Sequence, residues 1–282
     1  MSKRALRSLK ARYESWRIRR CEVGELIPPS NLIRVSNLNQ YVQTGQDWAS
    51  RLRTFGGLNP TDHVLEVGCG NGRVAIWLTR YLSEGQYTGF DLRRDEIQWL
   101  SDHVSVRYPA FNFLHSPIFN GFYNPDGHIT ADTYDFPFSD ESFDFVYLTS
   151  VFTHMLPGDV GHYLSEIKRV LKTNGKVFAS FFLLTVESGK FIQEGRSSRT
   201  FAHEVATGCF SDNIEVPEGA VAYSQERVET LCREVGLAII DPMHYGQWFR
   251  SKVLNAAIDY QDIILARKLG VDGSEMASVS NQ

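Results

Sequence analysis

A glycine-rich turn near residue 68 has the residue types and spacing to bind a polar or anionic ligand. Gly68, Gly70 and Gly72 occupy every second position directly after an apolar run over residues 63–67. Glycines allow a sharp turn and a close backbone approach, and free amides at the start of a following helix favour negative charge. Dinucleotide sites usually follow the pattern GxGxxG. Arg73 occupies the third glycine position here, so a nicotinamide or flavin cofactor is disfavoured.

Two carboxylates have positions relative to this turn that suit a ligand with a ribose. Glu66 lies two residues before the first glycine, and Asp91 ends the next apolar segment. An acidic residue about 20 residues after such a turn can accept hydrogen bonds from both ribose hydroxyls. The alternative role of Asp91 is to cap the end of a strand.

His154 is the best candidate for a general base in this sequence. It follows the apolar segment expected to form a strand at residues 143–149, at the edge of the sheet where a substrate would lie. Histidine suits proton transfer because its pKa lies near neutrality. His203 and His244 are weaker candidates. A simple hydrogen bond to a neighbour is the alternative role of His154.

Strand-like and helix-like segments alternate from residue 63 onward and would position these residues. This alternation predicts an α/β fold with a doubly wound, mostly parallel seven-stranded sheet and ligands at the carboxyl ends of its strands. The expected strands are residues 63–67, 87–91, 111–115, 143–149, 176–184, 237–245 and 260–268. The expected helices are residues 47–55, 71–82, 94–106, 159–171 and 224–235, with Ser224 capping the last, and residues 116–130 are expected to form a loop.

Three pieces fall outside this alternation. Residues 1–57 are predicted to form a basic N-terminal helical extension, and residues 58–270 the main domain. Residues 187–223 form an insert after the fifth strand, and we predict that they cover the substrate as a lid. Residues 271–282 are small and polar and are expected to be a flexible tail.

Four ordered segments resemble the class I S-adenosylmethionine-dependent methyltransferases. VLEVGCGNGR resembles the first motif of that family and YTGFDL the second. Residues 131–144 resemble its "DA..LPF.D.SFD" segment, and residues 166–176 its "E..RVLKPGG" segment. Thr133 replaces a small alanine, and Thr173-Asn174 replaces Pro-Gly. The resemblance covers residues 58–182 and implies a Rossmann-like methyltransferase fold.

The resemblance also implies S-adenosyl-L-methionine as the cofactor and a contact for each matched position. The glycine turn would face its methionine and ribose parts, and Asp91 would hold the ribose hydroxyls. Leu92 would pack on adenine, and Asp132 would lie near the exocyclic amine. Thr149 and Ser150 would line the methionine end. The implied cofactor-binding residues are Glu66, Gly68, Cys69, Gly70, Gly72, Arg73, Asp91, Leu92, Asp132, Thr133, Thr149 and Ser150.

The cysteine content argues against a metal site and a disulfide framework. The four cysteines form no CxxC pair and have no zinc-like spacing to histidine, so no metal is predicted and a reducing, cytoplasmic location is expected. They are Cys21, Cys69, Cys209 and Cys232. No apolar run reaches the roughly 20 residues that span a bilayer. The charged N-terminus has no apolar segment behind it, which argues against a secretory signal.

The charge distribution is asymmetric. Residues 1–60 hold eleven Lys or Arg and four Asp or Glu, whereas the other 222 residues hold 18 and 29. The first 20 residues carry this excess, and their apolar residues fall at helical spacing. Such a helix could lie on the inner membrane surface, bind RNA phosphates, pack on a second subunit of a homodimer, or simply cover the domain. The acidic remainder disfavours nucleic acid as a partner.

The whole pattern, including SVFTHM and the later GQW and YQDI segments, resembles bacterial methyltransferases that modify sugars of surface glycans, glycolipids or natural products. This resemblance implies O-methylation of a hydroxyl on a sugar, glycolipid or natural-product small molecule. The reaction would be an in-line displacement with deprotonation by His154. Aromatic residues of the insert could stack on a sugar or ring, or merely pack a lid. Residues 119–127 are expected to border the site.

Two other function classes remain open. One is an RNA or protein methyltransferase, although no NPPY-type tetrapeptide follows the fourth strand, which disfavours methylation of base amino groups. The other is a cofactor-binding scaffold protein without transferase activity, because intact glycines and Asp91 predict binding and not turnover.

Overall fold

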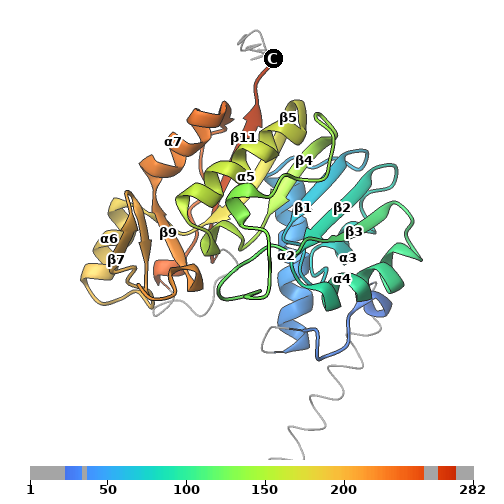
Figure 1. The fold of residues 1–282 in the computed structure, drawn as a ribbon, viewed down its shortest axis with the longest axis horizontal. Coiled ribbons are helices and arrows are strands. Elements are labelled where there is room, and N and C mark those ends of the chain that lie inside the picture. Colours follow the sequence, from blue (N-terminus) through green and yellow to red (C-terminus); the bar gives the residue numbers. More distant parts are fainter. Residues whose placement is uncertain (1–22, 34–36, 251–259, 271–282) are drawn as a thin grey trace, which may run out of the picture.

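The computed structural model describes residues 23–33, 37–250 and 260–270. Its centre is a seven-stranded sheet in the order β10-β11-β5-β4-β1-β2-β3 (Figure 1). The first five strands are parallel, and β11 runs antiparallel to both β5 and β10. The predicted doubly wound, mostly parallel sheet is therefore confirmed. The strands are β1 (His63–Val67), β2 (Gln86–Asp91), β3 (Phe111–His115), β4 (Phe143–Leu148), β5 (Leu171–Phe181), β10 (Leu237–Ile239) and β11 (Asp262–Lys268).

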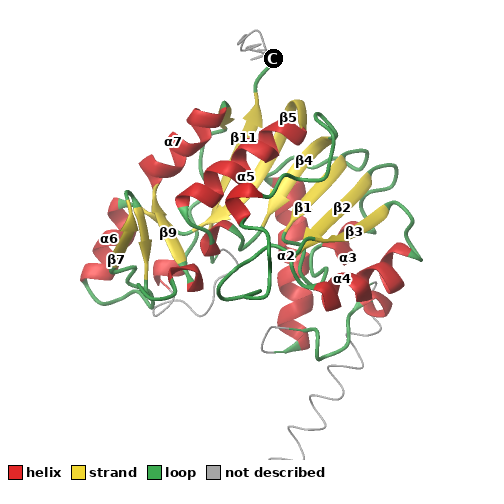
Figure 2. Ribbon diagram, in the orientation of Figure 1, coloured by secondary structure: helices red, strands yellow, loops and turns green. Residues whose placement is uncertain are grey.

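Helices cover both faces of this sheet (Figure 2). One core packs Val64 and its neighbours against α2 (Leu38–Thr54), α3 (Ala75–Leu78) and α4 (Arg94–Leu100), which a π-helical turn at Ser101–Ser105 continues. The other packs Leu65 and its neighbours against α5 (Pro157–Val170) and α7 (Gln225–Val235). Because both faces of the sheet are buried, the sequences of the central strands are nearly continuous apolar runs.

Local capping fixes the ends of two helices next to the site. Before α5, the Asp159 carboxylate accepts a hydrogen bond from the Leu156 amide at 3.3 Å. At the start of α7, the Ser224 hydroxyl oxygen accepts from the Arg227 amide at 3.2 Å, which confirms the predicted cap. Gly236 ends α7 in the left-handed region, with φ of 80°. Such a residue after a helix is most often glycine, because it carries no Cβ.

Several elements differ from their expected bounds, and three of these differences have a local physical reason. The helix expected over residues 71–82 is only the short α3, because the glycine turn extends into its first residues. The helix expected at residues 47–55 begins earlier, since the Asn37 side chain caps α2 by accepting from the Gln40 amide at 2.9 Å. The strand expected over 237–245 stops at Ile239, ahead of Pro242, which has no amide hydrogen to donate.

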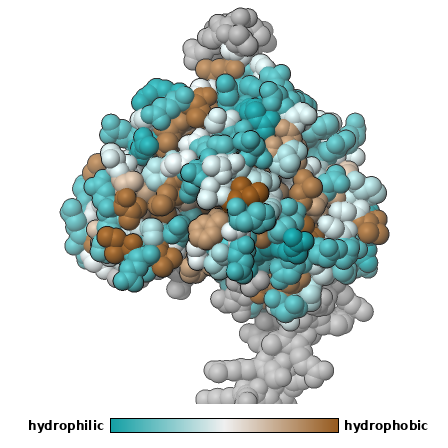
Figure 3. Space-filling model, in the orientation of Figure 1, coloured by the Kyte–Doolittle hydropathy of each residue, from teal (hydrophilic) through white to brown (hydrophobic). Residues whose placement is uncertain are grey.

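The insert after β5 forms a second sheet, where the sequence indicated no strands. Its order is β6-β9-β8-β7, and α6 (Val186–Gln193) flanks it. Aromatic side chains that include Phe182, Phe201 and Trp248 form a separate core there. Figure 3 shows apolar surface around this part of the molecule. The strands are β6 (Leu183–Leu184), β7 (His203–Ala206), β8 (Cys209–Ser211) and β9 (Val221–Ser224).

One carboxylate joins the two sheets. Asp262 at the start of β11 accepts hydrogen bonds from the Leu183 amide at 2.6 Å, the Gly246 amide at 2.8 Å and the Trp248 indole Nε1 at 2.9 Å. Burial raises the pKa of this carboxyl to about 6, against the effect of its three donors. The single side chain therefore fixes where the second sheet begins relative to the first.

No described helix is both long and apolar enough to cross a bilayer. The basic arm at residues 1–20 and the tail at residues 271–282 lie outside the described residues. Membrane contact through the arm, and its alternatives, therefore stay predictions.

A buried carboxyl connects three adjacent strands beneath the glycine turn. Glu66 on β1 accepts hydrogen bonds from the hydroxyls of Tyr87 on β2 and Tyr147 on β4, the latter at 2.6 Å. Burial raises the pKa of Glu66 to about 8, even though both tyrosine hydroxyls favour its ionised form. The side chain is therefore largely protonated at neutral pH.

Helix α2 packs directly on the glycine turn from outside. A Cβ atom at Gly45 would lie 2.1 Å from the Arg73 carbonyl oxygen, so only glycine allows this approach. One helical turn earlier, the Tyr41 hydroxyl donates to the Asn71 carbonyl at 3.1 Å. The position of the turn thus depends on α2 as well as on the sheet.

We expect Gly45→Ala to destabilise the protein by about 1–3 kcal/mol, the usual cost of overpacking. Alanine favours a helix by about 1 kcal/mol over glycine, so the steric contact must outweigh that gain. The free energy of unfolding in urea measures the effect. Gly189→Ala in α6 is the matched control, because a Cβ there meets nothing within 4 Å. Equal stability of the two variants would contradict the contact.

We expect Glu66→Gln to remove a pH dependence of folding stability. The pKa of Glu66 is raised to about 8 in the folded chain, so its contribution is fully present below its ordinary pKa of 4.5 and is lost as pH rises through 8. The glutamine keeps an oxygen for both tyrosines and does not titrate. Relative to this variant, the wild-type free energy of unfolding should fall by a few kcal/mol between about pH 5 and pH 9. Parallel pH profiles in urea would rule out this role.

Candidate active site

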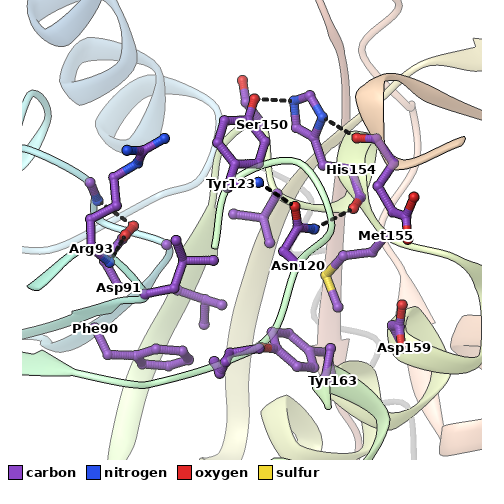
Figure 4. Close-up of a pocket in the computed structure, with 18 of the residues that line it drawn as sticks. Phe90, Asp91, Arg93, Asn120, Tyr123, Ser150, His154, Met155, Asp159 and Tyr163 are labelled. Atoms are coloured by element: carbon purple, nitrogen blue, oxygen red, sulfur yellow. Dashed lines mark hydrogen bonds between the residues drawn. The ribbon is translucent and has the colours of Figure 1, made fainter. Parts of the chain in front are cut away.

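A cavity of about 680 Å³ opens at the carboxyl ends of β1, β2 and β4. Its walls come from the glycine turn, the end of β2, the loop after β3 and the segment after β4 (Figure 4). Helices α2 and α5 and the insert each add side chains as well. This is the position where doubly wound folds bind their ligands.

The glycine turn is fastened to the end of β2. The Gly68 amide donates to the Phe90 carbonyl at 2.9 Å, and the Gly70 amide donates to the Asp91 carboxylate at 2.7 Å. Gly68 has a φ of 74°, and a Cβ atom there would lie 2.5 Å from a methyl carbon of Val151. Glycine is thus needed both for the turn and for its contact with the segment after β4.

Most of the residues with a predicted cofactor contact line this cavity. Asp91 is buried among them, and its other carboxylate oxygen accepts from the Arg93 amide at 2.9 Å. Burial raises the pKa of the Asp91 carboxyl, against the effect of the two amides. The predicted residues that line the cavity are Gly68, Gly70, Arg73, Asp91, Leu92, Asp132, Thr149 and Ser150.

Four predicted residues do not line the cavity. Glu66 points beneath the turn to its two tyrosines, and Cys69 is buried with its Sγ close to Gly89. A Cβ atom at Gly72 would lie 2.4 Å from Leu100 of α4, so this glycine serves helix packing. Thr133 lies in the helical turn η3 (Ala131–Thr133), where its hydroxyl bonds to that of Thr130 at 2.8 Å.

Arg73 is a partly buried cation at the cavity wall. Burial lowers the pKa of its guanidinium, while the nearby Tyr41 and Glu66 oppose that effect. Within the described part of the chain, the guanidinium forms no hydrogen bond or ion pair. A partly buried cation without a partner at the wall of a cavity favours an anionic ligand group.

Side chains from two distant strands hold the end of β4 in place. Ser150 has a φ of 59°, and its amide donates to the Ser180 hydroxyl oxygen on β5 at 2.8 Å. The hydroxyls of Ser150 and Ser180 both donate to the Gln261 side-chain oxygen, at 3.0 and 2.8 Å. This network turns the backbone so that Thr149 and Ser150 face the cavity.

His154 lies at the opposite wall, in the helical turn η4 (Phe152–His154), with both ring nitrogens hydrogen-bonded. Its Nδ1 lies 2.8 Å from the Glu218 carbonyl oxygen, and its Nε2 lies 3.2 Å from the Tyr123 hydroxyl. Burial, helped by the charge of Arg199, lowers the pKa of His154, against the effect of the Glu218 carbonyl. The ring is therefore neutral at physiological pH and can accept a proton.

The two weaker histidine candidates lie away from this cavity. His203 is exposed on β7, and His244 pairs through its backbone with Ile263 while its ring packs on Phe55. Among the residues that the structure describes, no cluster of three or more potential metal ligands occurs.

The cavity also contains residues that the sequence did not single out. Tyr41 comes from α2, Tyr163 from α5, and Glu218 from the helical turn η5 (Pro217–Gly219) of the insert. Asn120 and Tyr123 come from the segment that was expected to border the site. Tyr41 and Tyr163 resemble ordinary core aromatics of amphipathic helices, and Glu218 lies in an irregular loop, so no local pattern marks them.

Comparison with known proteins agrees with this geometry. Residues 65–179 match the protein family described as "Methyltransferase domain". The match starts in β1, includes the glycine turn and the end of β4, and ends in β5. It therefore covers the cofactor side of the cavity and stops before the insert.

Named relatives match over part of the chain. A phthiotriol/phenolphthiotriol dimycocerosates methyltransferase of Mycobacterium ulcerans is 34% identical over 40% of this chain and 34% of its own. A fatty-acid O-methyltransferase of Mycolicibacterium smegmatis is 33% identical over 43% of this chain and 36% of its own. The matched region thus spans about a third of the length of these relatives.

Solved structures share the fold at low identity. A 1,6-didemethyltoxoflavin-N1-methyltransferase of Burkholderia thailandensis, solved with S-adenosylhomocysteine, has a TM-score of 0.51 and 15% identity. The similarity covers 80% of this chain and 79% of that one. This likeness shows a shared fold, and the family match identifies residues 65–179 as a methyltransferase domain.

Proposed function

We propose that this protein transfers a methyl group from S-adenosylmethionine to a hydroxyl of a small molecule bound in the cavity. The observation that carries the proposal is that one cavity joins the fastened glycine turn to a neutral histidine. Arg73 and Asp91 lie with the turn, and His154 lies at the other wall. When bound, the cofactor supplies a methyl group on a positively charged sulfur.

The cavity residues fit the parts of this cofactor. Arg73, a partly buried cation without a partner among the described residues, would hold the carboxylate of the methionine part. Asp91 would accept from the ribose hydroxyls with the lone pairs that the two amides leave free. Leu92 and Asp132 would meet the adenine, and Thr149 and Ser150 the methionine chain.

The acceptor side of the cavity supports a substrate with an apolar part. Phe119 lines the cavity and is still 43% exposed, and Phe122 on the same loop is 58% exposed. The two named relatives act on a phthiotriol lipid and a fatty acid. We therefore propose a hydroxyl on a lipid, a glycolipid or a natural product. His154 would take the proton of that hydroxyl. The insert at residues 187–223, which contributes Glu218 to the cavity wall, would cover the substrate.

We expect Arg73→Met to weaken binding of S-adenosylhomocysteine by about 10–100-fold, because a charged hydrogen bond contributes roughly 1.5–3 kcal/mol. The affinity for 5′-methylthioadenosine, which lacks the amino-acid part, should stay within about twofold. Asp91→Ala is the matched comparison and should weaken both ligands alike. Calorimetry with the two ligands measures this. An equal loss of both with Arg73→Met would refute the proposed carboxylate contact.

We expect His154→Ala to lower turnover by about 10²–10⁴-fold, the usual contribution of a general base, with little change in cofactor affinity. Tritiated S-adenosylmethionine with oleyl alcohol, octyl glucoside and methyl α-rhamnoside as acceptors gives the measurement. His103→Ala is the control, because this exposed histidine bonds only to the Trp99 carbonyl. Equal loss of turnover and cofactor binding would indicate a structural role. A wild-type protein that binds cofactor without transfer to any acceptor would support the scaffold alternative.

A further inference from the structure

The hydrogen bonds of His154 determine which of its nitrogens can accept a proton. A carbonyl oxygen only accepts, so the contact of 2.8 Å to Glu218 requires that Nδ1 carries the hydrogen. In a neutral ring Nε2 then has the lone pair, and it accepts from the Tyr123 hydroxyl at 3.2 Å. The basic nitrogen is therefore already occupied by a tyrosine.

Tyr123 is held firmly in this position. The Asn120 side-chain oxygen accepts from the amides of Phe122 and Tyr123, at 3.1 and 2.9 Å. The ring of Tyr123 meets those of Phe122 and His154 edge-on, with centroids 4.9 and 5.0 Å apart. Figure 4 shows Tyr123 between Ser150 and His154 at the cavity wall. An acceptor that approaches His154 Nε2 thus meets the tyrosine hydroxyl first.

We propose that Tyr123 contacts the acceptor hydroxyl and relays its proton to His154, which Glu218 orients; this rests on the proposed function. The acceptor proton moves to the Tyr123 oxygen while the proton of Tyr123 moves to His154 Nε2. The acceptor oxygen bonds to the methyl carbon, and the carbon–sulfur electron pair returns to sulfur. The products are a methyl ether, a thioether and a protonated His154, and Tyr123 ends as a neutral phenol.

Two cations act on the Tyr123 side of this pair. Burial raises the pKa of Tyr123, and the guanidinium groups of Arg93 and Arg199 oppose that effect. Arg93 lies 5.4 Å above the Tyr123 ring, and Arg199 is paired with Asp212 at 2.9 Å. The two cations stabilise negative charge that develops on the phenol oxygen during transfer. Arg199 also lowers the pKa of His154, whereas hydrogen bonding to the backbone of Glu218 and Gly219 raises it and so favours the protonated ring.

Nitrogen-15 NMR of the imidazoles tests the pairing without knowledge of the acceptor. We expect the full chain with S-adenosylhomocysteine to show His154 as the Nδ1–H tautomer at about pH 7. Tyr123→Phe removes a donor that favours the neutral ring, so the pKa of His154 should rise and its Nε2 signal should shift. Loss of the signal in His154→Gln assigns it.

The matched control for this measurement is Tyr245→Phe, because this tyrosine bonds to Gln225 on α7, outside the cavity lining. It should leave the His154 signals unchanged. An Nε2–H tautomer in the wild type would overturn the relay. The relay would also be overturned if Tyr123→Phe left the NMR signals and the pKa of His154 unchanged.

Kinetics with whichever of the three acceptors is methylated tests the relay itself. Tyr123→Phe and His154→Gln should each lower kcat by about 10²-fold or more, with KM for S-adenosylmethionine within about threefold. The double variant should lose no more than the worse single variant, because the residues act in series. The acidic limb of the wild-type kcat profile should vanish in His154→Gln.

Three kinetic outcomes would overturn the relay. Unchanged kcat in Tyr123→Phe would mean that His154 acts alone. Losses that multiply in the double variant would mean that the residues act independently. A wild-type protein that binds S-adenosylhomocysteine but methylates none of the acceptors would overturn the proposed function, and the relay with it. Because the NMR result does not depend on turnover, it separates failure of the pairing from failure of the activity.

Discussion

The hydrogen bonds between the glycine turn and the end of β2 are the constraint on which the rest of the site depends. The Phe90 carbonyl accepts from the amides of Gly68 and Cys69, and the Asp91 carboxylate accepts from the Gly70 amide. These bonds join the chain that leaves β1 to the end of the neighbouring strand β2. They leave a hollow above β1 and β2 and hold Asp91 at its edge. Of the residues that follow in the turn, Gly70 lines the cavity and Gly72 packs on α4.

Other parts of the fold act on this turn from outside. Helix α2 approaches it at Gly45, which places Tyr41 against the turn and into the cavity wall. Glu66 connects the strand below the turn to both of its neighbours. A substitution at either place is therefore expected to alter the shape of the cavity, although neither Gly45 nor Glu66 lines it. Glycine is otherwise unfavourable within a helix, and this close approach is the physical reason for it at position 45.

Three titratable groups near the cavity are shifted by burial in the direction that lowers their charge. Burial favours neutral Glu66 and neutral His154 and weakens the proton affinity of Arg73. A neutral Glu66 leaves Arg73 without a full counter-charge inside the protein, which suits an anionic ligand group. A neutral His154 is ready to take a proton. Burial thus suits one wall of the cavity to an anionic ligand group and the opposite wall to the acceptance of a proton.

The sequence by itself determined the sheet and its cofactor turn, because both depend on local patterns. Apolar runs predicted the central strands, and the spacing of Gly68, Gly70 and Asp91 predicted where they meet. It gave no sign of β7 to β9, because these strands are short and alternate with irregular loops, and β6 falls within the single strand that was expected over residues 176–184.

Only the tertiary structure decided which side chains share the cavity. Glu66 and Gly72 matched the cofactor motif but serve the core, because strand and helix packing turn them away from the cavity. Tyr123 and Glu218 meet at His154 although 31 and 64 residues separate them from it. No periodicity connects residues so far apart. Their contact arises because the loop after β3, the segment after β4 and the insert converge at the same edge of the sheet, where parallel strands all end.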